Sequence, residues 1–310
     1  MKPFILTMSC LIITACATPK PALEKSNLDV KVRPVVAASE TLPASNFDTS
    51  AALKHAFALQ KSSDHVASYD AYSMIILRLA RDHKDRTQAL LGLADSALSL
   101  SWRAAKYQNR AHKLYTEIAA NSDNTPTQIH RAQAGLLLLN LRDYRPSAAE
   151  KHLRAALQDS PNDPRLWNAL GKVYDGEQQW LDALDAYIKA LSAAKSNGTN
   201  TAAVVNNMGM SLLMQGRKQE ALAKFKQARK ANPDMPVYDN NYRLALILSG
   251  NTGKALNGLS ETRTAQIYND AGVIAQSLGQ QKTAAHLYKK AIEKSPTYFE
   301  RAEKNLAGLG

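Results

Sequence analysis

The fold of this chain is decided by residues 167–190, which read WNALGKVYDGEQQWLDALDAYIKA. Gly171 and Ala183 are small enough to let two antiparallel helices approach each other closely. Four large side chains surround that contact: Trp167, Leu170, Tyr174 and Tyr187. A single helix pair of this kind cannot bury its apolar face alone, so the stretch predicts further copies in the chain.

Two further stretches carry the same residue types at the same offsets. The first consists of Val205, Met208, Gly209, Leu212, Ala221, Phe225 and Ala228, and the second of Tyr268, Ala271, Gly272, Ala275, Ala284, Tyr288 and Ala291. This order resembles the tetratricopeptide repeat, a helix–turn–helix unit of about 34 residues. We therefore predict an all-α tetratricopeptide-repeat solenoid of about six to seven helix pairs, closed by a C-terminal capping helix.

Weaker matches extend the solenoid over the rest of the chain. A degenerate copy begins near Pro236, and its second helix is expected to be short because Gly253 and Gly258 leave little room. We assign residues 126–310 to the repeats and residues 49–125 to divergent helical repeats. Helices are expected over residues 51–59, 66–79, 86–100, 104–119, 128–141 and 147–157, and the capping helix over residues 298–309.

The N-terminus has the features of a bacterial secretory signal. Lys2 precedes an apolar segment of about ten residues, which is too short to cross a membrane because spanning takes about 20. Residues 13–16 (ITAC) resemble the lipobox of bacterial lipoproteins, in which the peptide is cut before a cysteine whose thiol is lipidated. The resemblance implies that residues 1–15 are removed and that Cys16 carries a lipid anchor. Ala17 follows, where an aspartate commonly marks inner-membrane retention, so the resemblance also implies the periplasmic face of the outer membrane.

Residues 16–48 connect the predicted anchor to the helical part. The segment that follows the cysteine contains four prolines, several serines and threonines, and little periodicity. This composition is typical of a flexible tether, and about thirty such residues have an r.m.s. reach on the order of 30 Å.

Composition and motifs indicate a binding protein rather than an enzyme. The net charge of +12 suggests an acidic partner. Nucleic acid is not expected, because it does not suit the predicted compartment and the basic run 224–230 offers no aromatic platform for bases. The seven histidines include no H-x3-H or H-E-x2-H pair, and the only cysteines are Cys10 and Cys16. We find no nucleophile with an adjacent base. We therefore predict no catalysis, metal, cofactor or small-molecule substrate; an enzymatic site within residues 49–124 is the alternative.

One polar feature recurs on the first helix of each repeat. Counting from repeat starts at residues 164, 202, 236 and 265, position five is polar in all four copies and position six in the last three. Position five is Asn168, Asn206, Asn240 and Asn269, and position six adds Asn207, Asn241 and Asp270. First helices line the inner wall of such a superhelix, so we predict that these side chains bind the peptide backbone of a partner in a groove. Arg165 and Lys172 would add positive charge to this wall. The alternative is that some of the asparagines brace neighbouring helices.

A lipobox, a Pro-rich tether and a tetratricopeptide array together resemble the TadD lipoproteins of tight-adherence (Flp-type) pilus assembly. The segments YNDAGVIAQSLGQ (268–280) and YFERAEKNL (298–306) add to the resemblance. It implies a non-enzymatic assembly factor that binds pilus or secretin components in the periplasm. The alternatives are a pilotin or an adaptor for another envelope system, such as type IV pili, outer-membrane protein assembly or peptidoglycan enzymes.

Overall fold

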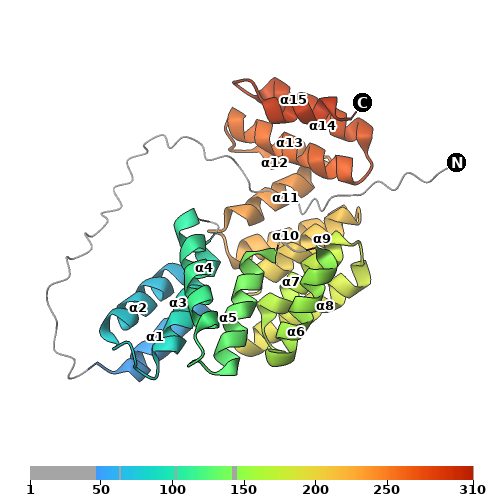
Figure 1. The fold of residues 1–310 in the computed structure, drawn as a ribbon. Helices are drawn as coiled ribbons and strands as arrows, with labels where there is room; N and C mark the ends of the chain where they lie inside the picture. The colour runs from blue at the N-terminus through green and yellow to red at the C-terminus, as the bar shows by residue number, and fades with distance from the viewer. Residues whose placement is uncertain (1–46, 63, 102, 142–144, 310) are drawn as a thin grey trace. The chain divides into compact units, whose positions relative to one another are not determined.

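The computed structural model describes residues 47–309 apart from 63, 102 and 142–144. Within this part of the chain the secondary structure consists of fifteen α-helices without a strand, as Figure 1 shows. The predicted all-α solenoid is confirmed. The signal peptide (1–15), the lipidated Cys16 and nearly all of the tether (16–48) lie outside the described residues.

The described helices form two compact units. The N-terminal unit ends at Asp143 and contains five helices: α1 (Thr49–Lys61), α2 (His65–Arg78), α3 (Arg86–Leu100), α4 (Ala105–Ala120) and α5 (Pro126–Leu139). The helices predicted over residues 51–141 are all present, with ends that differ by no more than a turn. α5, which the sequence pattern groups with the repeats, packs on α3 and α4.

The C-terminal unit holds the repeats that the sequence shows best. Its helices are α6 (Pro146–Asp159), α7 (Pro164–Gly176), α8 (Trp180–Asn197), α9 (Ala202–Met214), α10 (Lys218–Ala231), α11 (Pro236–Leu248), α12 (Thr252–Leu256), α13 (Glu261–Ser277), α14 (Gln281–Lys294) and α15 (Glu300–Ala307). Proline is the first residue of α6, α7 and α11, where its missing N–H costs no hydrogen bond. α12 has five residues, which confirms the predicted short second helix.

In each complete repeat, a glycine of the first helix packs directly against an aromatic ring of the second helix. A Cβ atom on Gly171 would lie 2.6 Å from the ring of Tyr187, and one on Gly209 would lie 2.7 Å from Phe225. The same contact joins Gly272 to Tyr288, at 2.5 Å. Real Cβ atoms essentially never come this close, so these positions require glycine.

The N-terminal unit uses the same contact in the opposite chain order. Gly92 on α3 lies against the ring of Tyr72 on α2, and Gly135 on α5 lies against Tyr115 on α4. Here the aromatic residue precedes the glycine, whereas in the C-terminal repeats it follows. The glycine–aromatic contact is therefore kept, but the order of its two residues in the sequence is reversed. This reversal explains why the tetratricopeptide pattern cannot be followed before residue 126.

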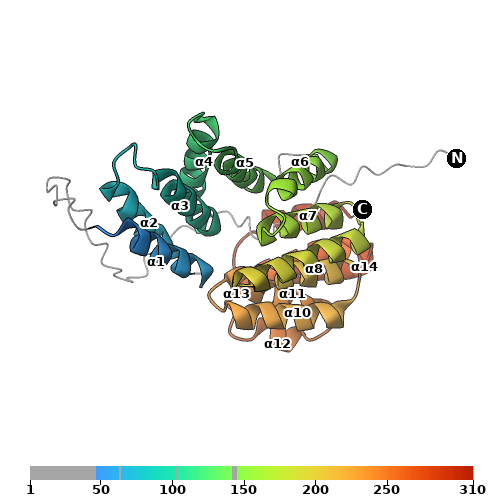
Figure 2. The same cartoon turned by 90° about the horizontal axis from the view of Figure 1, so that it is seen from below.

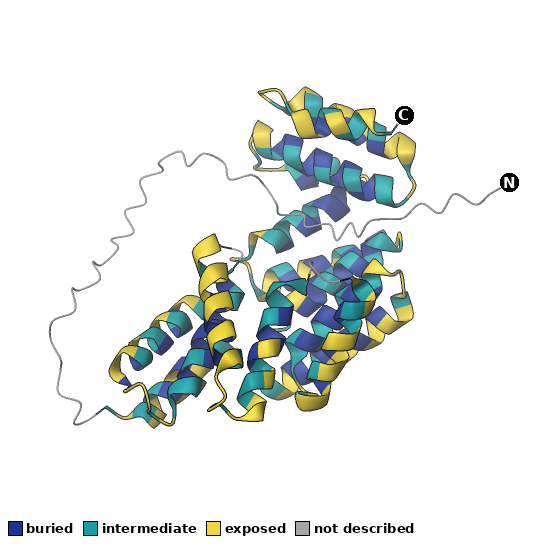
Figure 3. Ribbon diagram, in the orientation of Figure 1, coloured by how far each residue is buried: buried dark blue, intermediate teal, exposed yellow. Residues whose placement is uncertain are grey.

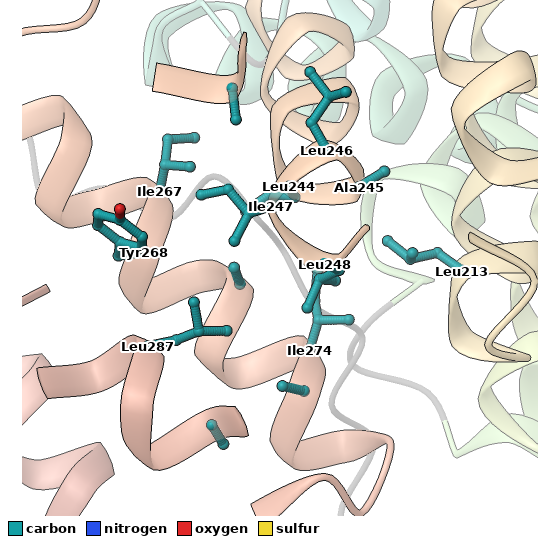
Figure 4. Close-up of a cluster of buried hydrophobic side chains, with 14 of the residues drawn as sticks. Leu213, Leu244, Ala245, Leu246, Ile247, Leu248, Ile267, Tyr268, Ile274 and Leu287 are labelled. Carbon is teal, nitrogen blue, oxygen red and sulfur yellow. The ribbon is translucent and has the colours of Figure 1, made fainter. Parts of the chain in front are cut away.

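The core of the C-terminal unit is continuous from α9 to α15. Leu244, Ile247 and Leu248 of α11 pack with Ile267 and Ile274 of α13 in this cluster (Figure 4). The buried residues follow the facing sides of neighbouring helices, and exposed residues follow the sides turned to solvent (Figure 3). Ala302 is fully buried on one side of α15, which closes the array against α14, as predicted for a capping helix.

We predict that Gly272→Ala lowers the stability of the C-terminal unit by about 1–3 kcal/mol, because the added methyl group overlaps the Tyr288 ring. Gly253→Ala is the matched control, since it also adds one methyl group to a helix but meets nothing within 4 Å. Urea unfolding followed by circular dichroism measures both. Equal unfolding midpoints for the two variants would show that the close contact is not needed.

Candidate partner-binding surface

The residues predicted to bind a partner all lie on the first helices of the C-terminal unit. α7 carries Arg165, Asn168 and Lys172; α9 carries Asn206 and Asn207; α11 carries Asn240 and Asn241; and α13 carries Asn269 and Asp270. Each of these helices contacts the next first helix in the array. The repeated pattern therefore does bring the predicted residues together along one series of adjacent helices.

The asparagines bind one another across these helices. Asn207 donates to the Oδ1 of Asn168 over 2.9 Å, and Asn241 donates to the Oδ1 of Asn206 over 2.9 Å. Asn206 in turn donates to the Oδ1 of Asn207 over 3.4 Å. Position six of one repeat thus donates to position five of the repeat before it, and the chain of amides links α7, α9 and α11.

The same rule continues to the end of the array. Asn305 of α15 donates to the Oδ1 of Asn269 over 2.9 Å, and Asn269 donates to Asp270 over 3.2 Å. At the third repeat, Arg263 of α13 takes the donor position and bonds to the Oδ1 of Asn240. The amide ladder is therefore a brace between consecutive repeats, because four of its hydrogen bonds join two different helices and the other two link neighbouring side chains on α9 and α13.

Three of the asparagines predicted to bind a partner are buried. Asn206, Asn241 and Asn269 are 6%, 3% and 1% exposed, so the expectation that they face an open groove is wrong for these three. Buried amides are usually hydrogen-bonded within the protein, and neighbouring asparagines supply a partner for each of these three, although the Oδ1 of Asn241 accepts no hydrogen bond from the described part of the chain. The bracing alternative describes these residues, and Asn168, Asn207, Asn240 and Asp270 remain partly exposed beside them.

The two predicted cations differ in their surroundings. The guanidinium of Arg165 bonds to Asp163, the N-cap of its own helix, over 2.7 Å, so much of its charge is neutralised locally. Lys172 lies one turn beyond Asn168 on the same helix and is partly exposed. The first-helix surface therefore carries two cationic side chains at α7.

The equivalent positions in later repeats are mostly apolar. Position nine, occupied by Lys172 in the first repeat, is Met210 on α9 and Val273 on α13, and both are partly exposed. Position two, occupied by Arg165, is the exposed Ala203 on α9 and the partly exposed Val237 on α11. The sequence pattern did not indicate these apolar positions, because only the asparagines at positions five and six recur from repeat to repeat. Together with the partly exposed Asn207, Asn240, Gln266 and Asp270, these apolar residues give the first helices a surface that is polar at α7 and mixed from α9 to α13.

Sequence reasoning also missed a polar cluster that joins α7, α8 and α9. The buried carboxylate of Asp175 accepts hydrogen bonds from the hydroxyls of Tyr187 and Ser211, each over 2.6 Å. Burial raises the pKa of Asp175 to about 6, because loss of hydration outweighs these two donors. Burial likewise raises the pKa of Asp270, against the hydrogen bond from Asn269.

The signal for this cluster was present in the sequence. Counted from the same repeat starts, the side chain at position twelve accepts a hydrogen bond from the tyrosine hydroxyl at position twenty-four. Asp175 accepts from Tyr187 in the first repeat, and Gln276 accepts from Tyr288 over 2.7 Å in the last. In the second repeat position twenty-four is Phe225, which has no hydroxyl, and position twelve is Leu213. The acceptor thus occurs only where there is a donor to satisfy.

The strongest polar cluster of the N-terminal unit is also internal. Asp95 on α3 is 5% exposed, accepts from the hydroxyl of Tyr115 on α4 and pairs with Arg131 on α5, both over 2.5 Å. These contacts tie three helices together. Over the described ranges, no group of three or more His, Cys, Asp or Glu side chains is placed to hold a metal ion, and no helix is long and apolar enough to cross a membrane.

Comparison with known proteins agrees with this geometry. Residues 163–234 match the family model of the tetratricopeptide repeat. None of the curated proteins matches the chain in sequence.

Several solved repeat structures are similar to the chain. A tetratricopeptide repeat protein from Parabacteroides merdae is 14% identical, covers 84% of this chain and 98% of its own, and has a TM-score of 0.42. The Cut9–Hcn1 hetero-tetramer of the APC/C is 14% identical over 83% of this chain and 48% of that one, with a TM-score of 0.51. YrrB, described as having an unusual peptide-binding site, is 18% identical over 63% and 98%, with a TM-score of 0.40. At these identities a likeness shows the fold alone, and of these three the one with a TM-score above 0.5, to the Cut9–Hcn1 structure, agrees with a helical-repeat solenoid.

We predict that Asp175→Asn stabilises the protein by roughly 1–3 kcal/mol at about pH 7, with a gain that disappears towards about pH 4. The raised pKa of Asp175 means that the folded state holds this proton more tightly than the unfolded state. Folding is therefore favoured at low pH and weakened as the pH rises through 6, and asparagine removes that penalty. Urea midpoints at both pH values test this.

The control for this prediction is Asp185→Asn, which removes an exposed carboxylate of α8 that pairs with Lys189. We expect a change within about 1 kcal/mol, as for other surface ion pairs. A destabilised Asp175→Asn protein at neutral pH would contradict the argument.

Proposed function

We propose that this chain is a non-enzymatic scaffold that binds protein partners on the first helices of its C-terminal unit. The observation that supports this most is the set of accessible apolar positions on α9, α11 and α13 (Ala203, Met210, Val237 and Val273), which lie among partly exposed polar side chains and next to the polar surface of α7. The side chains beneath these positions are fixed by the glycine contacts and the asparagine ladder. A partner would therefore meet a preformed surface, and little ordering cost would fall on the scaffold.

The chemistry of this surface selects the class of partner. Lys172, Asn168 and Asn207 offer a cation and amides at one end, while Met210 and Val273 offer apolar contact further along. A peptide segment would complement this surface if one end carried acidic side chains or an extended backbone, which the cation and the amides could bind, and the rest carried a stripe of apolar side chains. We propose such a segment of another envelope protein as the ligand.

We further propose that the protein works at the periplasmic face of the outer membrane, anchored through Cys16. The support is the sequence alone: an apolar signal segment, the ITAC lipobox and a tether of about thirty residues with a reach on the order of 30 Å. A tethered scaffold of this kind meets membrane-bound partners at high effective concentration.

The assembly that this scaffold serves is proposed to be the Flp-type pilus machine. The resemblance to TadD lipoproteins, carried by the lipobox, the tether, the repeats and the closing helix, supports this proposal. Genes for a secretin, a prepilin and a secretion ATPase beside this one would add support. Neighbours that encode cell-wall hydrolases would instead favour an adaptor for peptidoglycan enzymes.

We predict that a photo-crosslinking amino acid in place of Lys172 captures one discrete protein partner in cells. The same substitution at Lys226, an exposed residue on the second helix α10, is the matched control and should capture none. Asn168→Ala should weaken the capture while circular dichroism stays helical. Capture from position 226 but not from 172 would move the binding surface to the second helices.

We predict that Cys16→Ser moves the protein from the membrane fraction to the soluble fraction or leaves the signal peptide uncleaved. The thiol is the acceptor of the predicted lipid, and serine cannot replace it in this role. Cys10→Ser, which changes the other cysteine and leaves the lipobox intact, serves as the control. Unchanged membrane fractionation of a Cys16→Ser protein whose signal peptide has been cleaved normally would rule out the lipid anchor, without bearing on the binding surface.

A further inference from the structure

α8 exposes a line of large aliphatic side chains to solvent. Leu181, Leu184 and Ile188 are 84%, 43% and 53% exposed, and they follow one another at helical spacings of three and four. Leu191, half-buried, extends the line by one further step. This is the spacing of the seam of a coiled coil, and we call these four residues the α8 seam. In Figure 2 α8 is seen along its length, on the side turned to the viewer.

The repeat itself does not require apolar residues on this side. The positions of Leu181, Leu184 and Ile188 are occupied by Gln219, Leu222 and Lys226 on α10, and by Lys282, Ala285 and Lys289 on α14. On α6 they are Ser147, Glu150 and Arg154. The other second helices thus place mainly polar residues where α8 places three aliphatic ones, so the seam is a property of α8 and serves something other than the fold.

We propose that the α8 seam binds the α8 seam of a second copy of this chain, antiparallel and about a two-fold axis. An axis that crosses the exposed side of α8 midway between Leu184 and Ile188 brings Leu184 opposite Ile188 of the second copy, and Leu181 opposite its Leu191. Because the pairing is reciprocal, this single register matches all four residues, as a self-complementary interface requires. A parallel pairing would have no such symmetry about the centre of the helix.

The charges around the seam favour the same arrangement. α8 has an acidic residue in its first turn, Asp182, and a basic residue in its last turn, Lys195. The exposed Glu177 precedes the helix and adds to its acidic end. Antiparallel pairing sets the acidic end of each helix beside the basic end of the other, whereas parallel pairing would oppose like charges.

Dimerisation would have a direct consequence for binding. The seam is on a second helix, whereas the first-helix surface described above lies on α7, α9, α11 and α13. Two copies joined through α8 would keep both first-helix surfaces available. Such a dimer would bind a partner that presents repeated segments with higher avidity than a single copy. The dimer itself rests on α8 alone and does not depend on the proposed function.

Sedimentation velocity of the full chain in detergent, over a range of concentrations, tests the proposal. We expect a reversible dimer whose Kd rises about tenfold or more in Leu184→Glu, because a carboxylate then enters the centre of the seam. Leu181→Glu should act in the same way. Leu77→Glu is the matched control, since Leu77 is a 79% exposed leucine of α2, outside the seam. A wild-type chain that stays monomeric, or a dimer that Leu184→Glu leaves intact, would overturn the proposal.

Disulfide formation tests the register. In a Cys10→Ser, Cys16→Ser background the chain has no other cysteine, so Leu184→Cys combined with Ile188→Cys reports contacts of the α8 seam alone. Leu184→Cys by itself faces its own counterpart only in a parallel pairing, so it should form much less disulfide-linked dimer than the double variant. We expect the double variant to form a disulfide-linked dimer on mild oxidation. Met74→Cys combined with Leu77→Cys, an equally exposed pair on α2, should remain monomeric. Equal yields from both pairs would mean random collision and would refute the antiparallel contact.

Discussion

The close approach of a glycine to an aromatic ring is the constraint on which the rest of the C-terminal unit depends. Gly171, Gly209 and Gly272 let the paired helix come near enough for its aromatic side chain to fill the space that a Cβ would occupy. The absence of one atom, the Cβ of the glycine, thereby sets the distance between the two helices. Every other contact of the repeat, from the alanines of the second helix to the position-twelve acceptors, presupposes that distance.

The repeats are then joined by polar contacts that follow their own rule. Each asparagine at position five accepts from a donor of the following repeat, and at α13 and α15 the donors are Arg263 and Asn305. Hydrophobic packing between repeats has no direction and tolerates small slips, whereas an amide pair has a fixed geometry. The ladder therefore fixes the register of each first helix on the next, and its placement at the helix contact is what buries it.

The sequence sufficed for the helices and their pairing because those features depend on offsets within one repeat. It could not decide between a binding and a bracing role for Asn206, Asn241 and Asn269. That choice depends on how one repeat is rotated against the next, and the turns between repeats, which vary in length here, set the rotation. In the N-terminal unit the reversed order of Tyr72 and Gly92 removed the motif while keeping the contact, so recurrence alone did not reveal it.

These two layers of constraint restrict where function can reside. Core packing fixes the glycine and aromatic positions, and the ladder fixes positions five and six in most copies. The residue types that vary from repeat to repeat are those at positions two and nine of the first helices and those on the outward side of the second helices. Lys172, Met210 and Val273 differ at one of these positions, and α8 differs from α10 and α14 at another. Because the fold does not dictate these differences, we propose that the surfaces that carry them are the ones that recognise partners.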